Sequence, residues 1–245
     1  MIRRYVLGRY VLGTVAIALA VAACSSGTPD AGQPTAPTTA AKHSRASSPS
    51  ATPSVKPPNR RSRELPVAPG QASLPQTMAH PKTRGRAFHA MVTDLWLAVK
   101  TGKPSLGRMA FFPVGAYKQV KAIVDPAADW QSRLWDDFVL DVHAAHRLLG
   151  PDARAARLVT VLVAGAQAAW IDPGVCANRI GYWHVAESRL VYRLHGQERS
   201  FGVASLISWR GVWYVVHFGG VVRPAVGMVD SPQAGPGATG PQAGC

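Results

Sequence analysis

The sequence predicts an α+β domain in which helices come first and a curved antiparallel sheet follows. Up to Leu149, apolar residues recur every three to four positions, which is typical of helices that bury one face. Beyond Gly150-Pro151 they recur every second position, which indicates strands. Because the two periods are segregated along the chain, an α+β class fits better than alternating units around a parallel sheet.

Three helices are expected before residue 150. The first lies in RAFHAMVTDLWLAVKTG (residues 86–102), with Gly102 as its stop, and the second lies in VGAYKQVKAI (114–123). The chain turns at Asp125-Pro126, and the longest helix then covers Ala127–Leu149. Six apolar residues of this helix fall within about 120° of one another: Trp130, Leu134, Phe138, Val142, Ala145 and Leu149.

Five later segments have the strand pattern: RLVTVLVAG (157–165), QAAWID (167–172), SRLVYRL (188–194), RSFGVASLISW (199–209) and VWYVVHF (212–218). The first is nearly all apolar, which predicts a central strand. The turns HGQE and Arg210-Gly211 join the last three segments into antiparallel hairpins.

Residues 1–23 are expected to be a secretory signal peptide. Three arginines precede the apolar run Val11–Ala23, which is too short to cross a hydrocarbon core of roughly 30 Å. The end of this run, Val21-Ala22-Ala23-Cys24, resembles the bacterial lipobox, whose cysteine is lipid-modified and becomes the new N-terminus. The resemblance implies lipid attachment at Cys24 and a location in the cell envelope, on the outer face of the cytoplasmic membrane. The alternative is an ordinary secretory signal with an incidental cysteine.

Composition divides the rest of the chain into three parts. Residues 24–86 are rich in Pro, Ser, Thr and Ala and have no periodicity, which predicts a disordered linker. Residues 87–225 hold nearly every aromatic residue and suit one domain with its own core. Residues 226–245 form a second low-complexity stretch, which predicts a disordered tail.

The linker is strongly basic. Residues 25–86 carry nine Lys and Arg against Asp30 and Glu64, a net charge of +7 within a chain of formal charge +14. One interpretation is attraction to anionic envelope polymers or lipid headgroups. The other is a solvated spacer that its charge keeps extended. Nucleic acid is not an expected partner, because an exported lipoprotein rarely meets it.

The order and length of the elements are similar to those of the nuclear-transport-factor-2-like folds. In these folds a curved sheet wraps helices around a pocket, so the similarity implies a cone-shaped domain. The segments FFPVGAYKQVKAIVDPAADW, GYWHV and SLISWRGVWYVVHFGG also resemble an uncharacterised family of secreted actinobacterial proteins, often lipoproteins, over residues 88–222. That resemblance implies a compartment and domain limits, and it carries over no catalytic residue.

The sequence contains no catalytic motif, cofactor-binding loop or paired-cysteine zinc spacing, and no cofactor is expected. His143 and His146 lie on one helix face, but Asp136 is nearly two turns away from His143 and zinc needs a third ligand of its own. We therefore expect a polar helix flank here rather than a metal site.

A candidate pocket is expected on the concave face of the sheet. Alternation along the last strand puts His217 on the same face as Trp213, and Tyr192 belongs to the neighbouring hairpin. These three side chains could form an apolar pocket with one titratable anchor. A buried structural histidine is the simpler interpretation of His217.

A disulfide between Cys176 and Cys245 is a further hypothesis. These two cysteines remain once Cys24 is lipidated, and an oxidising exterior permits the bond. Closing a loop of nearly 70 residues would stabilise the fold by about 4 kcal/mol in the loop-entropy model. The alternatives are a buried free thiol at Cys176 and an incidental terminal cysteine.

Three functions are compatible with these features. The first is a lipoprotein whose tethered domain binds a small ligand or a protein partner without turnover. The second is an enzyme with a pocket acid–base site that includes His217. The third is a structural or accessory lipoprotein that acts through its basic linker.

Overall fold

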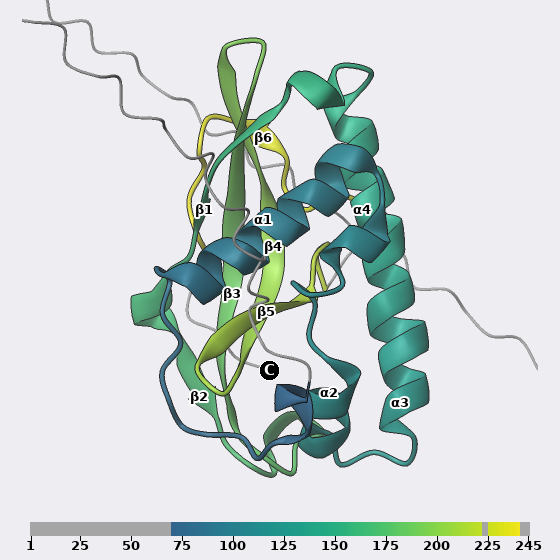
Figure 1. Cartoon of the computed structure of the whole chain (residues 1–245), viewed down its shortest axis with the longest axis vertical. Coiled ribbons are helices and arrows are strands. Elements are labelled where there is room, and N and C mark those ends of the chain that lie inside the picture. Colours follow the sequence, from purple (N-terminus) through teal and green to yellow (C-terminus); the bar gives the residue numbers. More distant parts are fainter. Residues whose placement is uncertain (1–69, 222–224, 241–245) are drawn as a thin grey trace, which may run out of the picture. The chain divides into compact units, whose positions relative to one another are not determined.

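The computed structural model describes residues 70–221 and 225–240, all within one unit of the chain, Pro57–Cys245 (Figure 1). The predicted signal peptide, Cys24, the linker up to residue 69 and Cys245 lie outside the described residues. The described part is α+β, with helices before residue 150 and a curved antiparallel sheet after it, as predicted.

The helices match the predicted periodicity. They are α1 (Arg86–Thr101), α2 (Val114–Val120), α3 (Pro126–Asp129), a π-helical segment η3 (Trp130–Trp135) and α4 (Asp136–Leu149). Gly102 ends α1 in the left-handed conformation (φ 64°), and the Asp125 side chain caps α3 by accepting from Ala127 N and Ala128 N. The three consecutive elements α3, η3 and α4 form the predicted longest helix, whose six apolar residues are all buried.

Short 3-10 turns connect the longer elements: η1 (Gln71–Ser73), η2 (Pro104–Gly107), η4 (Ala153–Ala155), η5 (Gly165–Gln167) and η6 (Val175–Ala177). The strands are β1 (Arg157–Leu162), β2 (Ala169–Ile171), β3 (Tyr182–Leu194), β4 (Gln197–Trp209), β5 (Val212–His217) and β6 (Gln233–Ala234). The main order is β1-β3-β4-β5, with β2 also paired to β3 and β6 to β4.

The prediction that 157–165 is a central strand is wrong. β1 pairs with β3 alone in the described sheet, and its residue Val159 is 45% exposed. The centre is occupied instead by β3 and β4, which have 13 residues each and pair along most of their length. A continuous apolar run does not by itself distinguish a buried central strand from a half-covered edge.

The core lies between the helices and the sheet. Figure 1 shows α1 crossing the strands, and its Trp96 ring lies 5.9 Å from the Tyr192 ring of β3. Phe138 of α4 contacts Phe111 and Phe218, with ring centroids 4.7 and 5.9 Å apart. These aromatic contacts pack α1 and α4 against the sheet side of the core.

The folded part extends beyond residues 87–225 on both sides. Before α1, the Gln76 side chain donates to the Ser208 carbonyl and accepts from Arg210 N. After β5, Gly202 N donates to the Asp230 carbonyl, and β6 pairs with β4. Composition alone did not reveal these segments, because backbone and amide hydrogen bonds supply much of their attachment to the sheet.

Candidate functional site

A pocket of about 550 Å³ lies between the sheet and the helical elements α2 and η3. Strands β3, β4 and β5 supply one side, and α2, η3 and the loop at Cys176 supply the other. Apolar side chains make up much of the wall: Val120, Leu134, Ile207, Val216 and Val221. The polar lining residues are Tyr117, Lys121, Arg133, Tyr182, His184, Glu187, Ser205, His217 and Asp230.

The strand register builds the sheet side of this pocket. His184 pairs with Ile207, and Ala186 pairs with Ser205, so these four residues lie on one face of the β3–β4 hairpin. All four line the pocket. Ser205 also pairs with His217 of β5, which brings His217 to the same face.

His217 and Trp213 do not share a face, contrary to the alternation in the sequence. Leu206 pairs with Val215, whereas Ser205 pairs with His217, so the register shifts by one residue at Val216. Such a bulge reverses the side that the following residues face. Trp213 and Tyr192 are 1% and 2% exposed in the core and do not line the pocket, whereas His217 does.

Ser205 and His184 form the polar centre of the sheet side. His184 Nε2 lies 2.7 Å from Ser205 Oγ, within hydrogen-bonding distance. Sequence reasoning missed this pair, because the residues are 21 positions apart and only the β3–β4 register brings them together. No local motif could have signalled it.

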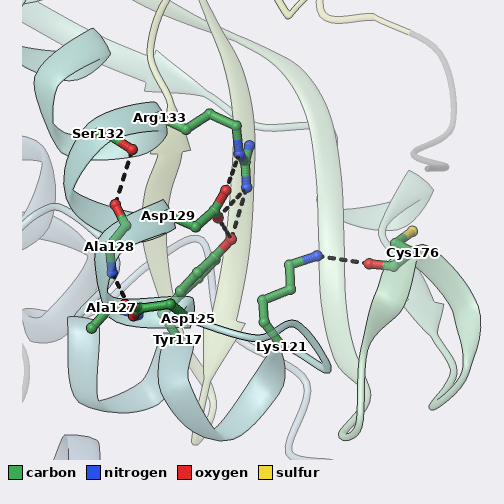
Figure 2. A network of polar contacts seen from close by, with 9 residues as sticks. All are labelled: Tyr117, Lys121, Asp125, Ala127, Ala128, Asp129, Ser132, Arg133 and Cys176. Carbon is green, nitrogen blue, oxygen red and sulfur yellow. Dashed lines mark hydrogen bonds and ion pairs between the residues drawn. The ribbon is translucent and has the colours of Figure 1, made fainter.

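Tyr117, Asp129 and Arg133 form a network on the helical side (Figure 2). Arg133 Nη2 donates to Tyr117 Oη at 2.7 Å and to Asp129 Oδ2 at 2.8 Å, and Tyr117 Oη donates to Asp129. The hydrogen bonds from Arg133 lower the pKa of Asp129, and burial raises the pKa of Tyr117 well above its usual range. At neutral pH the network is therefore a carboxylate–guanidinium pair with a neutral phenol.

Lys121 lies at the same end of the pocket. Its Nζ donates to the Cys176 carbonyl at 2.8 Å, and burial, followed by repulsion from Arg133, lowers its pKa (Figure 2). Among the described residues, no carboxylate forms an ion pair with Lys121, since Asp129 is already bound by Arg133. Lys121, Arg133 and Asp129 together give this end a net charge of +1.

The opposite end of the pocket is acidic. Glu187 and Asp230 line it, and both carboxylates attract the guanidinium of the nearby buried Arg189. Arg189 Nη2 donates to Ser200 Oγ and to the Ser231 carbonyl, at 2.8 and 2.9 Å. The pocket thus has a cationic end at α2 and η3, a histidine–serine centre and an acidic end at Glu187.

Cys176 lines the pocket and is disulfide-bonded. Its pairing with Cys245 stays a prediction, because residue 245 is outside the described residues.

The residues considered for a metal site lie on α4. His146 Nδ1 is 3.0 Å from the Val99 carbonyl oxygen, and Asp136 Oδ1 accepts a hydrogen bond from Gln131. Within 70–221 and 225–240, no three His, Cys, Asp or Glu residues are grouped to hold a metal ion.

Comparison with protein-family models, curated proteins and solved structures finds no match. In the described part of the chain, no helix has both the length and the apolar character that a membrane span requires.

Proposed function

We propose that this protein is a lipid-anchored envelope protein whose α+β domain binds a small amphipathic ligand and does not turn it over. The observation that carries the proposal is the pocket of about 550 Å³, with apolar walls and a few converging polar groups. Pockets of this size and lining are typical sites for small molecules. The lipobox-like sequence at Cys24 supports the anchor, and the composition of the linker supports a flexible tether.

The charges favour a ligand with one anionic group. Lys121 gives the α2 end an uncompensated positive charge, whereas the carboxylates at the other end lie near Arg189. A carboxylate could therefore accept from Lys121 Nζ, while an alkyl body packs along Leu134, Ile207 and Val216. Burial of the alkyl chain would supply most of the affinity. The anionic head group would set the orientation of the ligand in the pocket.

A head-group series tests this proposal. The full chain carrying Cys24→Ser, which has no lipid, is titrated calorimetrically with decanoate, decanol and decyltrimethylammonium. The titrations are run with and without a dithiol, since Cys176 lines the pocket and is disulfide-bonded. We expect saturable binding whose affinity decreases from decanoate to decanol to decyltrimethylammonium. Absence of binding by all three under both conditions would refute the proposal.

A second candidate function is acyl transfer, favoured by the 2.7 Å separation of Ser205 Oγ and His184 Nε2. A histidine this close could take the proton of a serine that attacks an ester. The test is hydrolysis of p-nitrophenyl decanoate by the native chain and by Ser205→Ala, His184→Ala and His217→Ala variants. Saturable turnover lost in any of these variants would replace the binder with an enzyme.

The anchor has a separate test. Changing Cys24→Ala should move the protein out of the membrane fraction and remove the acyl mass, because two acyl chains supply stable attachment. Retention in the membrane fraction, with no lipid found by mass spectrometry on the native chain, would contradict the anchor and leave the pocket proposal untouched.

A further inference from the structure

We propose that the domain has a second binding site, for a saccharide that carries a carboxylate or phosphate group. The site is a pocket of about 680 Å³ beside the segment that leads into α1, and we call it the basic pocket. It shares no lining residue with the pocket lined by Lys121, here called the Lys121 pocket. The proposal therefore does not rest on the function proposed for the Lys121 pocket.

Strand β3 separates the two pockets. Trp183 lines the basic pocket, whereas its neighbours Tyr182 and His184 line the Lys121 pocket. Successive residues of a strand point to opposite faces of the sheet, so the two pockets lie on different sides of β3. Trp183 pairs with Trp170 of β2, and the two rings are 5.6 Å apart. These indoles give this side of β3 an aromatic surface.

The segment before α1 supplies the charge of the basic pocket. His80, Lys82 and Arg84 line it and are exposed, and no Asp or Glu is among its described lining residues. Within residues 70–221 and 225–240, neither Lys82 nor Arg84 has an ion pair or a side-chain hydrogen bond. A hollow lined by cations alone attracts anions. The Arg84 guanidinium could hold a carboxylate or phosphate through two parallel hydrogen bonds.

Contacts with the sheet hold this segment in place. The Trp183 indole donates to the Met78 carbonyl at 3.1 Å, and the His80 ring lies 4.6 Å from the Trp183 ring. Further along, Thr83 packs closely against Gly165 of η5, where a Cβ atom would lie 3.1 Å from Thr83 Cγ2. The backbone that carries Lys82 is thus fixed on both sides, so an anion could bind there with little ordering of the chain.

The shape of the pocket favours a sugar over a flat aromatic ligand. The His80 and Trp170 rings meet the Trp183 ring at 62° and 69°. Neither is parallel to Trp183, so they form no slot with it that would sandwich a nucleotide base. A sugar presents C–H groups to aromatic rings and hydroxyls to polar atoms, and the Thr83 hydroxyl of the lining has no hydrogen-bond partner within the described part of the chain.

The size of the pocket excludes two simpler ligands. Its volume is far greater than that of a single inorganic anion and is typical of sites for small organic molecules. A bilayer surface could touch only the rim of such a hollow. An anionic saccharide, in contrast, could place its charged group at Lys82 and Arg84 and a ring beside Trp183.

NMR titrations test the site. The full chain carrying Cys24→Ser, isotope-labelled at histidine and tryptophan, is titrated with trigalacturonate, glucose 6-phosphate, maltotriose and inorganic phosphate. We expect saturable shifts of the His80 imidazole and Trp183 indole signals with at least one of the two anionic sugars. Maltotriose and inorganic phosphate should bind about tenfold more weakly or not at all. The readout is residue-specific because the linker also carries cations.

Several results would overturn the proposal. One is the failure of both anionic sugars to shift the His80 and Trp183 signals, and another is equal affinity for inorganic phosphate, which needs no sugar subsite. Adenosine 5′-monophosphate and phosphatidylglycerol vesicles are two further ligands in the series. Tighter binding of this nucleotide than of glucose 6-phosphate, or binding of vesicles without binding of either sugar, would replace the saccharide with another class of partner.

Paired substitutions test the cations. Lys82→Met with Arg84→Met should weaken binding of the anionic sugar about tenfold. Lys103→Met with Arg147→Met is the matched control, since both residues are exposed and line neither pocket. The control should lose less than about twofold, and the affinity of the native chain should fall as the ionic strength rises. Equal losses in the two paired variants would reveal general charge attraction instead of a site at Lys82 and Arg84.

Discussion

Lys121 and Arg133 lie at the same end of the pocket but have different partners. Arg133 is held by Asp129 and Tyr117, whereas Lys121 donates only to a backbone carbonyl among the described residues. An anion entering the pocket would have to break the carboxylate–guanidinium pair to use Arg133, but it could meet Lys121 directly. We therefore assign the binding of the ligand's anionic group to Lys121.

Replacing Lys121→Met should weaken decanoate binding about tenfold, equivalent to about 1.4 kcal/mol, because a charge-assisted hydrogen bond is lost. Decanol binding should change little. Lys118→Met is the matched control, since Lys118 is an exposed residue of α2, three positions before Lys121. In the native chain, decanoate binding should weaken as the pH rises through the lowered pKa of Lys121, below the ordinary lysine range. An equal loss of decanoate affinity in the Lys121→Met and Lys118→Met variants would contradict the assignment of anion binding to Lys121.

The contribution of Asp129 to stability depends on pH in the opposite direction to decanoate binding by Lys121. Its pKa is lowered in the folded state by Arg133, so its contribution to stability is present above the unfolded value of about 3.9 and disappears as the pH falls through the folded pKa. Asp129→Asn should therefore reduce the free energy of unfolding at pH 6, and the difference from the native chain should shrink at pH 3. Urea unfolding at the two pH values measures this. A difference in free energy of unfolding that grows on acidification would show that the fold does not lower the pKa of Asp129.

At the scale of elements, the helical half of the fold was predictable and the sheet was only partly so. Helical periodicity located α1, α2 and the long helix, because each buries one face. The edge position of β1 and the separation of Trp213 and His217 onto different faces were missed for different reasons. Which strand is central depends on the lengths of its partners, and the face of His217 depends on one unpaired residue at Val216.

The candidate site, too, could be predicted only in part from the sequence. His217 does reach the pocket, although the predicted neighbours Tyr192 and Trp213 belong to the core. Lys121, His184 and Ser205 were not predicted, because they come from the end of α2, β3 and β4 and meet only through tertiary packing. A single sequence contains no local signal for the proximity of residues that are this far apart along the chain.

The long helix depends on its aromatic contacts. Phe138→Ala should lower the free energy of unfolding by about 3–5 kcal/mol, since Phe138 is 1% exposed and contacts Phe111, Trp135 and Phe218. Leu140→Ala on the same helix, 44% exposed, should cost no more than about 0.5 kcal/mol. Chemical denaturation of both variants provides the measurement. Similar costs would mean that α4 does not pack as described.

At the scale of the whole molecule, the folded domain includes residues before Ala87, from Gln71 onward in the described part of the chain. Gln71 accepts from the Trp209 indole, and Gln76 is bound to Ser208 and Arg210. Limited proteolysis should therefore leave a stable core that retains residues 71–86, which N-terminal sequencing of the core determines. A core that begins at Arg86 or later would show that these contacts are not maintained in solution.

We propose that an anionic amphiphile binds in the pocket lined by Lys121, His184 and His217. The most direct measurement is a decanoate titration of the isotope-labelled full chain carrying Cys24→Ser, under reducing conditions and followed by NMR. We expect saturable shifts of the His184 and His217 imidazole signals and of the Lys121 side-chain signal, with the signals of the exposed His195 unchanged. Saturable binding that leaves these three signals in place would show that decanoate does not bind in this pocket.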